Sequence, residues 1–140
     1  MQIENITLDQ LNDFNKDTLI EHLGIEVISF NSETLVARMP VDKRTHQPLG
    51  LLHGGASAVL IESLGSIGSS LLIDHEVEYP VGIEINANHV GGIKSGFVIG
   101  EAKIVHQGRK THVWAVDVKN EATGKLVCTG RLTVMIIQKK

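Results

Sequence analysis

The amino-acid sequence predicts an α+β fold in which an antiparallel sheet wraps around one long central helix. A helix-length stretch in the middle of the chain is almost free of charge, and such a helix is expected to be buried on nearly every side. The segment after it alternates between apolar and polar residues, which is the period of a half-buried strand. Further strand-length segments, separated by turn residues, lie on both sides of the helix in the sequence.

The segments before the central helix are predicted to form a helical start followed by a hairpin. Residues 1–24 carry apolar residues at helical spacing, with Thr7 as the cap and Gly24 as the residue that ends the helical region. Strand-like runs follow at 26–30 and 34–39, and the three polar residues between them are predicted to form the turn.

The central helix and the strands after it complete the predicted fold. A loop over 40–50 leads into the helix, which is predicted at 54–74. Four strands are predicted to follow, at 81–90, 97–106, 111–120 and 126–137. In the first of them, the face predicted to be apolar carries Ile83, Ile85, Ala87 and His89.

Length and composition exclude several classes of protein. The 140 residues suit one domain spanning 1–140, and the net charge of −3 argues against a nucleic-acid partner. Cys128 is the only cysteine, so the chain has no disulfide framework, and the seven histidines show no zinc-ligand spacing, so no metal is expected. The N-terminus lacks signal-peptide features and no apolar run is long enough to span a membrane, so a cytoplasmic location without membrane contact is expected.

Glu62 is the only formally charged residue between Arg44 and Asp74. A carboxylate in a buried helix is costly to desolvate and tends to acquire a shifted pKa. Two interpretations remain open from this feature alone. Glu62 either points to water from a single exposed stripe of the helix or takes part in chemistry.

The helix is predicted to begin at His53-Gly54-Gly55. The first N–H groups of a helix have no partner within it and lie at the positive end of its dipole. Because Gly54 lacks a side chain, a substrate oxygen could approach its N–H closely, as an oxyanion hole requires. The alternative is that the two glycines only allow a tight turn into the helix.

Residues 46–55 (HQPLGLLHGG), followed by Glu62, resemble the hot-dog-fold acyl-CoA thioesterases. The sequence is most similar to the branch that contains one type of 4-hydroxybenzoyl-CoA thioesterase and related enzymes of siderophore and menaquinone synthesis. The resemblance extends from residue 23 through the INANH run at 85–89 to the last strand. It therefore implies a hot-dog fold, an antiparallel sheet wrapped around one long central helix.

The resemblance also implies catalytic roles at matching positions. Glu62 matches the carboxylate that either attacks the thioester carbonyl or activates water, and Gly54 matches the oxyanion N–H donor. Other positions match polar groups that support the carbonyl or the water, or line the acyl pocket: Gln47, His53, Ser66 and His89. Coenzyme A is then part of the substrate, and no separate cofactor is expected. Each of these side chains also has an ordinary structural interpretation when it is considered singly.

Residues that bind the substrate's coenzyme A are expected at strand ends, where cations are available for phosphate groups. The expected positions, with Gly55 beside the oxyanion donor, are Gly55, Lys94, Ser95, Gly96, His106, Gly108, Arg109 and Lys110. Charged turns are commonly only solvated, and that interpretation stays open for them.

The spacing of Gly54 and Glu62 predicts a shared active site. Eight residues separate them, so they lie about 12 Å apart along the helix and about 80° apart around it. A single thioester carbon must lie about 3 Å from both groups. Two antiparallel helices across a two-fold axis satisfy this better than one chain, so a homodimer with two composite sites is predicted. The resemblance further implies a dimer of dimers, a homotetramer.

The sequence thus predicts an acyl-CoA thioesterase, with an aromatic acyl group favoured because His89 and Ser66 could meet a ring hydroxyl. Aliphatic acyl chains stay open. Two alternatives also remain: an acyl-thioester hydratase or dehydratase, and a non-catalytic acyl-CoA-binding module. Release of free thiol from an acyl-CoA distinguishes the thioesterase from both.

Overall fold

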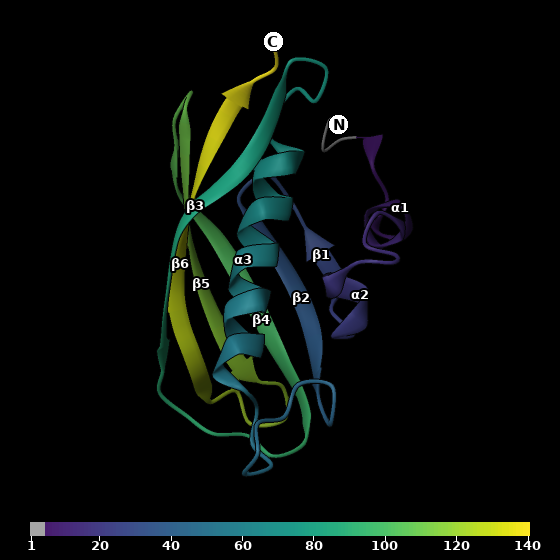
Figure 1. The fold of residues 1–140 in the computed structure, drawn as a ribbon, viewed down its shortest axis with the longest axis vertical. Coiled ribbons are helices and arrows are strands. Elements are labelled where there is room, and N and C mark those ends of the chain that lie inside the picture. The colour runs from purple at the N-terminus through teal and green to yellow at the C-terminus, as the bar shows by residue number, and fades with distance from the viewer. Residues whose placement is uncertain (1–4) are drawn as a thin grey trace.

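A computed structural model describes residues 5–140, in which six antiparallel strands form one sheet in the order β1-β2-β4-β5-β6-β3. The long helix α3 (Gly54–Leu71) lies against one face of this sheet, and the short helices α1 and α2 lie to one side of it, near β1 (Figure 1). The other bounds are α1 Leu8–Asp13, α2 Leu19–His22, β1 Glu26–Phe30, β2 Thr34–Val41, β3 Glu78–His89, β4 Gly96–Gln107, β5 Thr111–Asn120 and β6 Leu126–Gln138. This arrangement confirms the predicted α+β class with a sheet wrapped around one helix. Among residues 5–140, no helix is both long and apolar enough to cross a membrane.

The N-terminal region differs from the predicted helical segment over 1–24, of which residues 1–4 lie outside the described part of the chain. Thr7 caps α1 as predicted, in a capping box with Gln10. Asp17 adopts a positive φ of 58° between the two helices, a conformation that a continuous helix cannot contain. Gly24 has a φ of 70° after α2, which confirms that it ends the helical region.

Several element boundaries also differ from the prediction. Strand β2 continues through Pro40 to Val41, where a loop was predicted, and in this part it pairs with β4 alone. Strand β3 runs from Glu78 to His89 rather than over 81–90. Strand β4 begins and ends one residue outside 97–106, and β6 ends one residue after 137. Helix α3 ends at Leu71 rather than at 74, and His75 Nε2 lies 2.7 Å from the Ser70 carbonyl oxygen near this end.

The core forms where α3 meets the concave face of the sheet. Two glycines of α3 allow the helix to approach the sheet closely. A Cβ at Gly65 would lie 2.5 Å from Leu132, and one at Gly68 would lie 2.6 Å from the Trp114 ring. Both partner side chains are buried. The many small residues of the helix, which weaken its intrinsic propensity, are therefore explained in part by contact with large side chains of the sheet.

Strand β3 forms one edge of the sheet and pairs only with β6. Its register shifts between Gly82 and Glu84, so Ile83 is an extra residue in a β-bulge and has no register partner on β6 within the described chain. The prediction that Ile83 shares a regular face with the other alternating residues is therefore wrong. Ile85, Ala87 and His89 do share one face, because they pair with the buried residues Leu132, Gly130 and Cys128.

Candidate active site

Glu62 lies in the middle of α3, half-buried, with its carboxylate against the backbone of β3. A Cβ added to Gly82 would overlap Glu62 Oε1 and lie 3.2 Å from Cδ. Within residues 5–140, the carboxylate makes no hydrogen bond and no ion pair. Burial raises the pKa of Glu62 above its ordinary value of 4.5. The side chain therefore lies between α3 and the edge strand, unpaired among residues 5–140 and partly desolvated.

His53 caps the N-terminus of α3 and leaves one N–H group free. Its Nδ1 accepts a hydrogen bond of 2.7 Å from the Gly55 N–H, and its carbonyl oxygen accepts one of 2.9 Å from the Ala56 N–H. The Gly54 N–H has no acceptor among residues 5–140. Of the two glycines, Gly54 is thus the one whose donor is available to an external oxygen.

His89 lies against this helix start, at the end of β3. A Cβ at Gly54 would be 2.8 Å from His89 Nε2, so the imidazole covers the α-carbon of Gly54. Ser66 is twelve residues further along the helix, about 18 Å at 1.5 Å per residue. Within one chain, therefore, the structure brings His89 to Gly54 and keeps it well separated from Ser66.

Gln47 lies in a loop that hydrogen bonds hold beside the start of α3. The backbone N–H of Gln47 donates to the Leu51 carbonyl oxygen at 2.8 Å, and its side-chain oxygen accepts from the Leu49 N–H. The His53 N–H donates to the Thr45 carbonyl oxygen at 2.8 Å, which closes the loop against the helix N-terminus. The side-chain oxygen of Gln47 is used within the loop, and its amide NH2 group makes no hydrogen bond to residues 5–140.

The two predicted coenzyme-binding segments lie at opposite ends of β4. Residues 94–96 precede the strand, and His46 Nε2 lies 2.8 Å from the Lys94 carbonyl oxygen, next to the loop that carries Gln47. Residues 106–110 form the end of β4 and the turn that follows it. The twelve residues of β4 span roughly 36 Å at 3.3 Å per residue. One chain therefore does not bring the two segments together.

The Thioesterase superfamily matches residues 49–127, which include the start of α3, Glu62 and most of the sheet. The chain belongs to the thioesterase superfamily. The six-stranded sheet with its packed helix and the likeness to solved thioesterases confirm the predicted hot-dog fold. The protein is accordingly a thioester hydrolase, and the predicted enzyme class is confirmed.

Relatives of this thioesterase include characterised and structurally determined proteins. It is 45% identical over 132 residues to the 1,4-dihydroxy-2-naphthoyl-CoA hydrolase of Escherichia coli, covering 94% of this chain and 96% of that protein. It is 43% identical over 133 residues to the proofreading thioesterase EntH of Cronobacter turicensis, covering 95% and 96%. The crystal structure of a mutant thioesterase from Pseudomonas aeruginosa superposes with a TM-score of 0.93 at 47% identity, covering 96% of each chain.

A buried polar cluster behind the thioesterase's central helix was not predicted from the sequence. Ser69 Oγ accepts a hydrogen bond from Trp114 Nε1 at 2.9 Å and lies 3.0 Å from His112 Nδ1. All three side chains are buried, and burial lowers the pKa of His112 from 6.5. The only sequence signal was that His112 and Trp114 alternate along β5, which places them on one face. The cluster ties the helix to the sheet.

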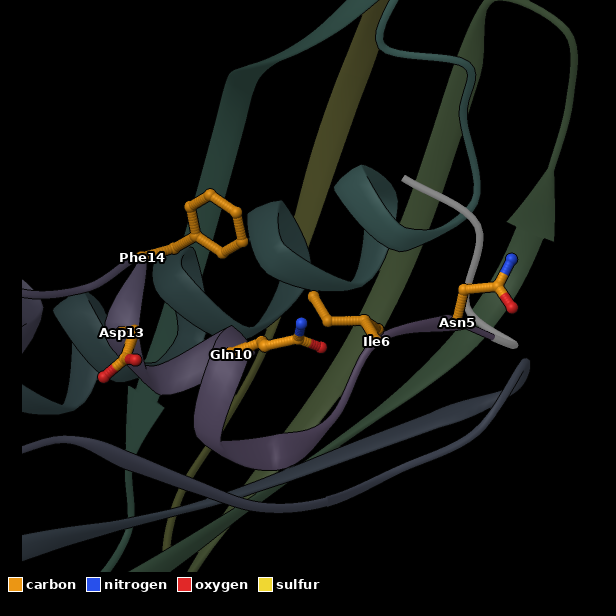
Figure 2. A pocket seen from close by; sticks show the side chains of 5 residues that line it. All are labelled: Asn5, Ile6, Gln10, Asp13 and Phe14. Carbon is orange, nitrogen blue, oxygen red and sulfur yellow. The ribbon is translucent and has the colours of Figure 1, made fainter.

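A separate hollow of about 430 Å³ lies beside α1 in this thioesterase (Figure 2). Figure 2 shows Ile6, Gln10 and Phe14 around it, and Asn5 and Asp13 complete the lining. The Asp13 carboxylate is paired with Lys16 at 2.7 Å. The hollow lacks the combination of an unpaired carboxylate and a free helix N–H that Glu62 and Gly54 offer. Within residues 5–140, no three His, Cys, Asp or Glu side chains are grouped to hold a metal ion.

Proposed function

We propose that this protein hydrolyses acyl-CoA thioesters, with Glu62 of one subunit and the Gly54 N–H of its partner acting on the same carbonyl group. The observation that carries the proposal is that the same chain offers two groups without partners among residues 5–140. One is the partly desolvated carboxylate of Glu62, and the other is the N–H of Gly54 at the start of the helix. The first group is suited to a nucleophile or general base. The second is suited to an oxyanion donor, whose hydrogen bond strengthens as charge develops on the carbonyl oxygen.

Two routes are compatible with this arrangement. In one, Glu62 attacks the thioester carbon, the C–S bond breaks, and water then hydrolyses the resulting mixed anhydride. In the other, Glu62 takes a proton from water, the hydroxide attacks the carbon, and the proton passes to the departing thiolate. Both consume one water and release a free acid and the thiol of coenzyme A.

The proposed dimer pairs the β3 edges of two chains across a two-fold axis. Apolar side chains are exposed along this edge, with Ile83 51% and Tyr79 43% exposed, although bare edge strands are usually protected. Such a pairing would extend the sheet and set the two α3 helices antiparallel, so that Gly54 of one chain faces Glu62 of the other. It would also bring His89 of one chain near Ser66 of the other. We further propose a dimer of dimers, supported by Val81 and Met135, which are paired across strands and each 39% exposed.

The cations of the coenzyme site are proposed at the ends of β4. In the proposed dimer β5 and β6 separate β4 from the paired β3 edge, so the β4 strands of the two chains do not lie side by side. We propose that the cations at one end of β4, either Lys94 or Arg109 with Lys110, bind the phosphate groups. We propose an aromatic acyl group, because a relative with 45% identity is a 1,4-dihydroxy-2-naphthoyl-CoA hydrolase. The cytoplasm, where acyl-CoA is available, is the proposed location.

The first experiment measures thiol release from benzoyl, 4-hydroxybenzoyl, 1,4-dihydroxy-2-naphthoyl and straight-chain CoA thioesters, with Glu62→Ala beside the wild type. We expect a loss of kcat of about 100-fold to 10,000-fold in Glu62→Ala. Glu33→Ala, which removes an exposed carboxylate in the β1–β2 turn, is the matched control and should retain wild-type activity. Retention of most activity in Glu62→Ala would refute the assignment of this residue. Tight binding of acyl-CoA without thiol release would favour the binding module, and hydration of an unsaturated acyl group would favour the hydratase.

Subunit mixing tests whether the sites are shared. Gly54→Pro removes the proposed donor at the first helical position, where the backbone suits proline, and its ring also displaces His89, whose Nε2 would lie 2.8 Å from a Cβ there. If sites are composite, a mixed dimer of Glu62→Ala and Gly54→Pro contains one intact site. Mixing the two inactive variants should then recover about a quarter of the wild-type activity at statistical exchange, because half of the dimers are mixed. No recovery after verified exchange would place both groups in the same chain.

A further inference from the structure

We infer that Gly82 is a positioning residue for Glu62: its missing side chain and the adjoining bulge at Ile83 form a gap in β3 that the carboxylate occupies. This inference rests on the proposed function in one respect, namely that Glu62 is the reacting carboxylate. The gap itself is a geometric property of α3 and β3. It can therefore be tested separately from catalysis.

The contact between the two residues leaves no room for a side chain at position 82 while the Glu62 carboxylate keeps its place. A Cβ there would overlap Glu62 Oε1 and lie 3.2 Å from Cδ and 3.6 Å from Oε2. Glu62 has no hydrogen bond or ion pair within residues 5–140 that would hold its carboxylate elsewhere. The shape of the strand is thus what determines where the carboxylate lies. Alanine at 82 would force Glu62 into another rotamer or push β3 away from the helix.

The bulge explains how one strand can serve both ends of the site. Residues 82 and 89 are seven positions apart, so a regular strand would point them to opposite faces. The extra residue Ile83 shifts the alternation of side chains between the two faces by one residue. Gly82 pairs with buried Val134 and His89 pairs with buried Cys128, so both face α3. One inserted residue therefore places the gap opposite Glu62 and the imidazole opposite Gly54.

A displaced carboxylate is expected to affect chemistry more than substrate binding. Glu62 lies between α3 and β3, and the proposed coenzyme contacts are at the ends of the strands. A shift of about 1 Å in a reacting group can cost about 100-fold in rate. Gly82→Ala should accordingly lower kcat by about 100-fold and change KM by less than about threefold.

The test is a double-mutant cycle with four proteins: wild type, Gly82→Ala, Glu62→Ala and the double variant. Kinetics are measured with the best thioester of the substrate panel, and melting temperatures and sedimentation are measured for all four. Because the clash requires the Glu62 carboxylate, Gly82→Ala should lower the melting temperature by about 4 °C or more in the wild type and by less than about 1 °C in Glu62→Ala. Gly92→Ala is the matched control, because its Cβ would meet only Leu51 at an ordinary 3.6 Å.

Each outcome decides the inference. A loss of kcat in Gly82→Ala, together with a destabilisation that disappears when Glu62 is absent, supports the positioning role. If Gly82→Ala fails to fold while the double variant folds, the same conclusion holds. Equal destabilisation in both backgrounds, failure of both to fold, or a kcat within about threefold of wild type would overturn it. If the proposed function is wrong, the Glu62→Ala variant retains activity. The melting temperatures of the four proteins still test the contact between Gly82 and Glu62 in that case.

Discussion

Replacing Ser69 by alanine should destabilise the fold far more than the loss of one exposed serine would. Its hydroxyl is the hydrogen-bond partner of Trp114 Nε1 at 2.9 Å and of His112 Nδ1 at 3.0 Å, with Ser69 fully buried and His112 only 3% exposed. Each buried polar group left without a partner costs about 1–3 kcal/mol. The two together therefore cost about 2–6 kcal/mol, and the better helix propensity of alanine returns only about 0.5 kcal/mol.

Equilibrium unfolding in urea measures this cost directly. The protein concentration must be the same for every variant, because association contributes to the apparent stability. We expect the free energy of unfolding to fall by at least about 2 kcal/mol in Ser69→Ala. Ser70→Ala is the matched control: its side chain makes no hydrogen bond within residues 5–140, and it should remain within about 0.5 kcal/mol of wild type. A Ser69→Ala protein within about 1 kcal/mol of wild type would contradict the assignment of the cluster as a tie between helix and sheet.

Two further predictions concern pH. Because burial raises the pKa of Glu62, the acidic limb of the pH profile of kcat/KM should have its midpoint above pH 4.5. A midpoint at or below pH 4.5 would argue against Glu62 as the group that titrates. Burial lowers the pKa of His112 from 6.5, so on acidification the unfolded chain takes up this proton before the folded protein does. The contribution of neutral His112 to the free energy of unfolding is therefore complete above pH 6.5. It is lost as the pH falls from 6.5 towards the pKa of His112 in the folded protein. Urea midpoints between pH 7.5 and 5 should therefore fall more in wild type than in His112→Gln, and parallel curves would be inconsistent with this linkage.

The sequence determined most of the elements of this protein and pointed to its candidate reacting groups, because both follow from local patterns. Strands β1 and β5 have the predicted bounds. Glu62 stood out because a lone charge in an apolar helix is visible without any tertiary information. The central helix begins at Gly54 as predicted, and the structure adds that His53 caps it. The predicted roles of Glu62 and Gly54 stay predictions until the variants above are measured.

Only the tertiary structure decided how these groups are held. The sequence pointed to the Gly54 N–H, but only the structure shows that His53 Nδ1 accepts from Gly55 and leaves the Gly54 N–H without an acceptor among residues 5–140. Gly82 read as an ordinary strand residue, because its contact with Glu62 depends on how β3 packs against α3. The bulge at Ile83 is defined by pairing with β6, some fifty residues later in the chain. Such features join residues far apart in sequence, so their physical cause lies in packing and strand register, and no local pattern of residues contains it.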